Sequence, residues 1–146
     1  MTAGSFHSIV LKQDGSVWAT GSNDVGQLGA KSTRNWLRYV QVVTDGAKAL
    51  ATGRRHSVML KQDGSVWTTG YNRYGQLGDG STIDSRIFAQ VIADDAKLVA
   101  AGAFHSMMLN QDGSLWVTGS NLHGQFGDGF RTNAKVFAIL EAFGNG

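Results

Sequence analysis

The sequence contains no cysteine and no proline among its 146 residues. Without cysteine the chain can form no disulfide, no thiolate metal site and no cysteine nucleophile. Without proline its tight turns must be built from other residues, and the 20 glycines are the obvious source. The composition, 42% hydrophobic and 16% charged, is typical of a globular protein with a core and excludes a disordered chain.

Long apolar runs and strong charge are missing as well. No stretch approaches the roughly 20 apolar residues of a membrane-spanning helix, and residues 1–4 lack the pattern of a signal peptide. We therefore expect a protein of the cytoplasm or nucleus with no membrane segment. The net charge of +2 is too small to predict binding to nucleic acid.

What the sequence does contain is a repeat with a period of 49 residues. The aligned segments that begin at Gly4, Gly53 and Gly102 are GSFHSIVLKQDGSVWATGSNDVGQLG, GRRHSVMLKQDGSVWTTGYNRYGQLG and GAFHSMMLNQDGSLWVTGSNLHGQFG. Fifteen of these 26 columns are identical in all three copies, without a gap. We expect one repeat domain over residues 1–146, with repeats at 4–52, 53–101 and 102–146, the last repeat lacking its final strand.

Each repeat predicts four short β-strands and no helix. Residues 7–11 and 17–20 are rich in β-branched and aromatic side chains and flank an Asp-Gly turn, which indicates a hairpin. The later strands are expected at 37–43, 87–92 and 136–140, and at 47–51 and 96–100. Four strands in a unit of about 40–50 residues predict an all-β fold of propeller blades. Closed propellers have about four to eight blades. We therefore expect these three blades to be part of a longer propeller. The alternative is a ring formed by two chains that associate head to tail.

The motif GxxHSxxLxxDGSVWxTGxNxxGQLGDG resembles the regulator of chromosome condensation repeat, and the resemblance covers nearly the whole chain. Family members form propellers of about seven blades. The resemblance implies a non-enzymatic protein-interaction scaffold. The alternative that it implies is part of a guanine-nucleotide exchange factor for a small GTPase, or a chromatin-docking propeller. Exchange in the family depends on a complete ring and an inserted hairpin, and the uniform spacing leaves no room for an insertion between these repeats.

The repeated polar residues predict structure rather than catalysis. His7, His56 and His105 occur once per repeat, so a propeller would hold them apart, and we expect each to hydrogen-bond a neighbouring turn. The serine after each histidine points to the opposite face of the strand, which argues against a catalytic pair. We expect Asp14 and its equivalents to close their own turns, and Trp18 and its equivalents to be buried in the core. The sequence predicts no catalytic residue, no metal and no cofactor.

The partner-binding residues are expected where the repeats differ. One variable window precedes the histidine, and the other follows the W-x-T-G strand. Loops at one edge of a rigid scaffold commonly carry binding sites, and Arg and Tyr are enriched at interface hot spots. The candidates for binding a protein partner are Arg54, Arg55, Tyr71, Arg73, Tyr74, Phe6, Phe104 and His123. Further repeats or a second copy of the chain are the other expected partners.

Overall fold

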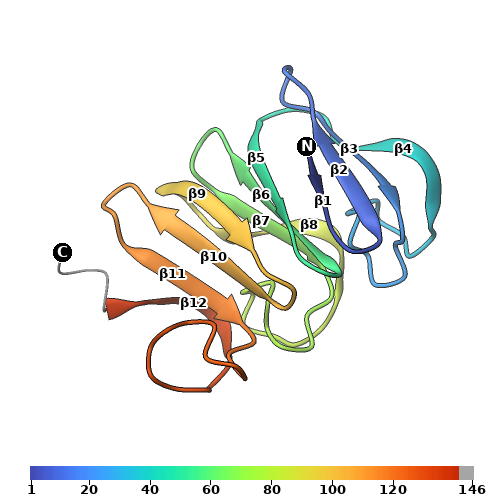
Figure 1. Ribbon diagram of the computed structural model, residues 1–146. Coiled ribbons are helices and arrows are strands. Elements are labelled where there is room, and N and C mark those ends of the chain that lie inside the picture. The colour runs from blue at the N-terminus through green and yellow to red at the C-terminus, as the bar shows by residue number, and fades with distance from the viewer. Residues whose placement is uncertain (142–146) are drawn as a thin grey trace.

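The computed structural model describes residues 1–141, which form three four-stranded antiparallel sheets arranged side by side as propeller blades (Figure 1). The first blade contains β1 (Thr2–Ala3), β2 (His7–Leu11), β3 (Val17–Gly21) and β4 (Trp36–Val43). The second contains β5 (Ala47–Thr52), β6 (His56–Lys61), β7 (Val66–Gly70) and β8 (Ser85–Ile92). The third contains β9 (Ala96–Ala101), β10 (His105–Asn110), β11 (Leu115–Gly119) and β12 (Ala134–Ile139). Among these residues, none lies in a helix long and apolar enough to cross a bilayer.

The boundary between blades differs from the one expected. Residues 47–51 were predicted to finish the first repeat, but β5 pairs with β6 and is the inner strand of the second blade. The same holds for β9, which pairs with β10. The prediction was wrong because a strand pattern does not say which neighbouring hairpin it joins. As a result the third blade has all four strands, and β1 occupies the inner position of the first.

The D-G-S-x-W turn is a local hydrogen-bonded unit that appears in every blade. Asp14 accepts hydrogen bonds from the backbone N–H and the hydroxyl of Ser16, at 2.9 and 2.6 Å. The Ser16 hydroxyl then accepts a hydrogen bond of 3.1 Å from the indole of Trp18. Gly15 takes the positive φ of 82° that the turn requires. The aspartates therefore close their own turns, as predicted.

The tryptophans are half-buried, so the prediction that they are core residues was wrong. The reason is that each indole reaches back to its own turn serine at the edge of the blade, where Lys12 and Lys61 lie 4.3 Å over the rings of Trp18 and Trp67. One face of Trp67 still packs against the core between the first two blades. The tryptophans thus cover the core without filling it.

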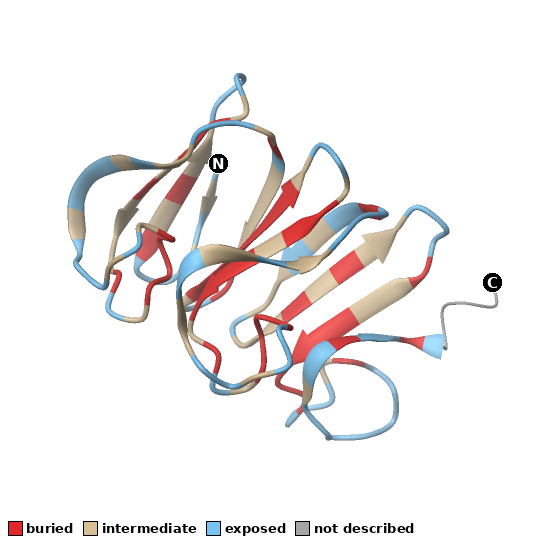
Figure 2. Ribbon diagram, turned by 180° about the vertical axis from the view of Figure 1, so that it is seen from behind, coloured by how far each residue is buried: buried red, intermediate tan, exposed pale blue. Residues whose placement is uncertain are grey.

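Most of the core lies between blades. Figure 2 shows that the buried residues are concentrated on the middle strands of each blade, whereas the outer strands β4 and β8 have none. Ile9 and Val17 of the first blade and Met59 of the second belong to one buried cluster. Val58 and Met108 belong to the corresponding cluster between the second and third blades. Because alternate residues of a strand face opposite sides, β6 contributes Met59 to one cluster and Val58 to the other. Every blade is therefore stabilised chiefly by its neighbours.

A histidine joins each pair of adjacent blades. Nε2 of His7 lies 3.0 Å from the hydroxyl of Ser57 in the next blade, and Ser57 donates a 2.6 Å hydrogen bond to the carbonyl of Gln27 in the first blade. His56, Ser106 and Gln76 repeat this arrangement at 3.0 and 2.7 Å. Since the serine has a single hydrogen and gives it to the carbonyl, the histidine must donate through Nε2. We call this set of hydrogen bonds the interblade joint.

The glycine that opens each repeat makes room for the joint. A Cβ on Gly53 would overlap the imidazole of His56 and approach within 2.5 Å of the Gly102 carbonyl oxygen. A Cβ on Gly4 would similarly meet the ring of His7 and the Gly53 carbonyl. Both glycines have ordinary backbone angles, so the requirement is for space and not for an unusual φ. The G-x-x-H spacing therefore reflects close packing of the backbone against the histidine.

We expect Gly53→Ala to lower the free energy of unfolding by about 3 kcal/mol, because neither the backbone carbonyl nor the buried ring can move away. Gly46→Ala is the control. Gly46 has a φ of 81°, but a Cβ added there would have no other atom within 4 Å, so the loss should be about 1 kcal/mol. Urea denaturation of both variants measures the difference. Equal losses would contradict the packing argument.

Candidate partner-binding rim

The two variable windows of the repeat lie side by side at one edge of the blades because the main chain ties them together. Ser22 N–H donates to the Phe6 carbonyl at 2.8 Å, and Tyr71 N–H donates to the Arg55 carbonyl at 2.9 Å. Ser120 and Phe104 form the same bond at 2.8 Å in the third blade. Any side chain at these positions is therefore displayed on the same edge, whatever its identity.

Six of the eight predicted residues line one cavity of about 350 Å³ at this edge. We call them the rim surface: Phe6, Arg54, Arg55, Tyr71, Tyr74 and Phe104. They come from all three blades, so the cavity exists only when the blades are packed. Ser22 and Asp24 also line it and were not among the predicted residues. The signal that could have identified them is their position in the variable loop that follows the W-x-T-G strand of the first repeat.

Three aromatic rings form the floor of the rim surface. The centroids of Tyr74 and Phe104 lie 5.1 Å apart, and Tyr71 lies 6.2 Å from Tyr74 and 6.4 Å from Phe104. The rings are tilted or edge-on to one another, which is the favoured arrangement of aromatic pairs. Tyr71 and Tyr74 belong to the second blade and Phe104 to the third. The cluster therefore spans a blade junction and offers rigid apolar area.

The two arginines of the rim surface differ in their surroundings. Arg55 is paired with Asp24 of the first blade, and its guanidinium lies 5.4 Å over the ring of Tyr71. Arg54 is exposed, lies 5.8 Å over the Phe104 ring, and forms no ion pair within residues 1–141. Burial acts to raise the pKa of the Asp24 carboxyl, but hydrogen bonds from Gln27 and Ser22 and the charge of Arg55 outweigh it and hold that pKa below its usual value. Among residues 1–141, Arg54 is thus the arginine of the rim surface that has no ion pair.

Two predicted residues lie outside this cavity. Arg73 lines a separate hollow with Tyr74 and Lys135. His123 is exposed in the loop of the third blade, where its main-chain N–H donates to the side-chain oxygen of Gln125 at 2.9 Å. Their role in binding stays a prediction.

The histidines form Ser–His contacts, but not of a catalytic kind. Sequence reasoning correctly placed His7 and Ser8 on opposite faces, yet it missed that the ring reaches Ser57 instead of a neighbouring turn. Ser57 is fully buried and gives its hydrogen to a main-chain carbonyl, so the histidine does not act as its base. Within residues 1–141, no three His, Asp or Glu side chains are grouped so that they could hold a metal ion.

Burial in the joint lowers the pKa of these histidines. Desolvation brings the pKa of His7 to about 4, and desolvation with repulsion from His7 and His105 brings that of His56 to about 3. The pKa of His105, which faces no further blade within residues 1–141, is also lowered by burial. The neutral rings are the form that fits the donor role of Nε2.

Comparison with known proteins identifies the family. A model of the regulator of chromosome condensation (RCC1) repeat matches residues 1–27, 47–76 and 96–125, and a second model of that repeat matches residues 63–109. The chain therefore belongs to the RCC1 repeat family. Two of the matched segments begin at 47 and 96, where β5 and β9 begin, in agreement with the observed blade boundaries. No curated protein matches the sequence.

Solved structures confirm the propeller architecture. Yeast RCC1 (Prp20), in a complex with Kap60, matches at 21% identity and a TM-score of 0.85, over 94% of this chain and 36% of that chain. Prp20p from Saccharomyces cerevisiae alone gives 21% identity and 0.86, over 94% and 37%. Human WBSCR16 gives 26% identity and 0.81, over 94% and 37%. The chain thus spans little more than a third of the length of these proteins.

The lowered histidine pKa values predict a loss of stability in weak acid. The unfolded chain binds protons at these residues below about pH 6.5 while the folded chain does not, so their contribution is complete above pH 6.5 and is lost as the pH falls toward 4. At pH 5 the loss should be about 2 kcal/mol for each of His7 and His56. Urea denaturation at pH 7, 6 and 5 measures it.

The variant His56→Gln assigns this loss to the joint. Its stability at pH 7 should fall, because Ser106 loses its ring partner, but its stability should depend less on pH between 7 and 5 than that of the unchanged chain. His123→Gln, on the exposed loop, is the matched control and should keep the full dependence. An unchanged slope in His56→Gln would show that the joint histidine is not the group that titrates.

Proposed function

We propose that this chain is a non-enzymatic protein-interaction module and that its partner binds the rim surface. The observation that carries the proposal is the gathering of aromatic and arginine side chains from three blades around one cavity. Aromatic residues and arginine are enriched in interface hot spots. The frame that holds them is constant between repeats, whereas these side chains vary, which is how a scaffold presents a specific surface.

The charges of the rim surface favour a partner segment with an acidic side chain. Asp24 neutralises Arg55, whereas Arg54 has no ion pair within the described residues 1–141. A carboxylate bound to Arg54 would lie beside Phe104, so an apolar residue next to that carboxylate could pack on the ring cluster. An arginine already held over an aromatic ring loses little freedom on binding. The proposed partner therefore presents a short acidic and apolar segment.

A second candidate is docking on a small GTPase or on chromatin. It is favoured by the structural similarity to Prp20p, whose structure is described together with its binding to Gsp1p and histones. That similarity covers little more than a third of Prp20p. A shared fold alone does not imply a shared activity, so it does not support exchange by itself. Purified Gsp1p with labelled nucleotide, and purified histones, distinguish the candidates. Accelerated nucleotide release would favour exchange, whereas the module proposal expects none.

The rim proposal is tested by reversing the free charge. Arg54→Glu should weaken partner binding by about tenfold or more, and Tyr74→Ala by a similar factor, the size of loss expected at a hot spot. Arg54→Glu should leave the free energy of unfolding nearly unchanged, because Arg54 is exposed. Tyr74→Ala should lower it by about 1 kcal/mol, because it removes the ring contact with Phe104 across the blade junction.

Arg86→Glu is the matched control, because Arg86 is an exposed arginine on β8 of the same blade but outside the cavity. Proteins that the unchanged chain retains from a cell extract are identified, and the amount of each that every variant retains is measured. The protein that binds the unchanged chain most strongly is then purified, and its affinity is measured by calorimetry. If every retained protein binds Arg54→Glu and Tyr74→Ala as well as it binds Arg86→Glu, the rim surface is not the binding site.

A further inference from the structure

The face of the third blade that points away from the second blade has the same structure as two faces that the following blade covers in the first two blades. Among residues 1–141, no blade covers it. Gly26 and Gly75, in the G-Q-L-G loops of the first two blades, pack tightly against backbone atoms of the following blade. At the equivalent Gly124, an added Cβ would have no other atom within 4 Å. Likewise Gln27 is fully buried, whereas Gln125 is half-buried. Within residues 1–141, no strand lies on this face, which we call the tail face.

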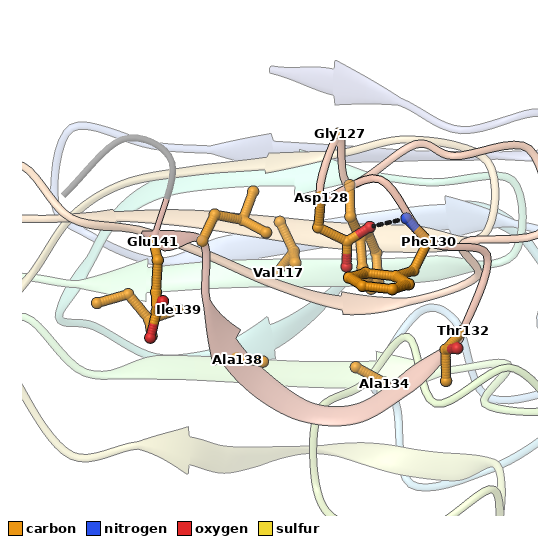
Figure 3. A pocket seen from close by; sticks show the side chains of 11 residues that line it. Val117, Gly127, Asp128, Phe130, Thr132, Ala134, Ala138, Ile139 and Glu141 are labelled. Carbon is orange, nitrogen blue, oxygen red and sulfur yellow. Dashed lines mark hydrogen bonds between the residues drawn. The ribbon is translucent and has the colours of Figure 1, made fainter. Parts of the chain in front are cut away.

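The tail face is apolar and hollow. It contains a cavity of about 410 Å³ next to a small buried cluster of Val117, Phe126 and Leu140. Figure 3 shows Val117, Ala138 and Ile139 around the cavity, with the Phe130 ring on one side. Met107 is packed against the same cluster but is only partly buried. In the second blade the equivalent residue, Val58, is fully covered by the third blade.

The first blade exposes the opposite half of the same kind of junction, which we call the head face. Ser8 and Thr20 occupy the positions of Ser57 and Thr69, which are fully buried against the preceding blade. Tyr39 occupies the position of Phe137, which is 7% exposed, yet Tyr39 is 49% exposed. The head face therefore carries the groups that complete a junction elsewhere in the molecule. Thr20 donates to the Trp36 carbonyl of its own blade at 2.8 Å, but neither it nor Ser8 has a hydrogen-bond partner in another blade among residues 1–141.

We propose that the tail face binds the head face of a second copy of this chain, so that copies associate head to tail. The two internal junctions define the contacts. His105 would donate to Ser8 of the second copy as His56 donates to Ser106. Thr69 shares its hydroxyl hydrogen between the Gly26 and Ser85 carbonyls, at 2.8 and 3.0 Å. Thr20 of the second copy, which donates to the equivalent Trp36 carbonyl at 2.8 Å, would share its hydrogen in the same way with the Gly124 carbonyl of the first copy.

Apolar side chains fit the same arrangement. Phe88 and Phe137 each fill the space beside a loop glycine of the preceding blade, Gly29 and Gly78. Tyr39 would fill the corresponding space beside Gly127 at the cavity of the tail face. At the rim, where Arg55 pairs with Asp24, the new junction would bring together the equivalent residues Phe6 and Leu122. These are 62% and 49% exposed, so an apolar pair replaces the ion pair.

This contact joins two different faces, so one blocked face per chain is sufficient to stop association. Tyr39→Glu blocks the head face and Met107→Glu blocks the tail face. Sedimentation velocity should show the unchanged chain growing in mass with concentration, and each variant alone as a monomer. An equimolar mixture of the two variants should form a single 1:1 dimer, because it retains one intact head and one intact tail. That dimer would also prove that both variants are folded.

Ile83→Glu, at an exposed site of the second blade, is the control and should associate like the unchanged chain. A monomeric unchanged chain at all concentrations would overturn the proposal. So would a dimer of either blocked variant alone, since that would require a symmetric contact between like faces. Loss of association in Ile83→Glu would also count against the assigned faces.

Discussion

The interblade joint is the interaction on which the rest of the structure depends. A four-stranded blade of this size has only a small apolar cluster of its own, such as that of Val117, Phe126 and Leu140, so most of its apolar side chains must be buried against a neighbour. The joint fixes how neighbours meet, because the histidine of one blade, the serine of the next and a main-chain carbonyl form one continuous set of hydrogen bonds. The rim surface and its cavity exist because this contact sets the spacing between blades.

Much of the fold could be predicted from the sequence, since three segments that share the same turn and strand residues must adopt the same local structure. The hairpins around Asp14 and its equivalents were predicted because the turn chemistry lies within a few residues. The joint could not be predicted, since His7 and Ser57 are 50 residues apart and meet only through the packing of blades. The partial exposure of Trp18 was missed because an apolar residue in the middle of a strand is typical of the core. The sequence pattern does not show that the indole turns back to its own turn serine.

The position of the candidate site could be predicted where main-chain hydrogen bonds fix which loops lie side by side. One main-chain hydrogen bond in each blade, such as that between Tyr71 and Arg55, brings the two variable windows together. Six of the residues that we predicted from their variability and from the enrichment of Arg and Tyr at interfaces therefore line one cavity. His123 makes the same main-chain hydrogen bond to Gln125 that Tyr74 makes to Gln76, so the loop itself does not separate them. Tyr74 packs on Phe104 of the following blade, whereas no blade follows the third among residues 1–141. The same constant frame underlies the rim, since it repeats one junction between blades while the side chains at the rim change from repeat to repeat.

The central claim is that the repeated histidines are neutral donors that hold blades together. The most direct measurement is the nitrogen NMR spectrum of His56 between pH 7 and 4.5. The account predicts a ring that stays neutral, carries its proton on Nε2 and exchanges slowly with solvent while the protein is folded. A His56 that titrates near pH 6.5 in the folded protein, or that carries its proton on Nδ1, would contradict it.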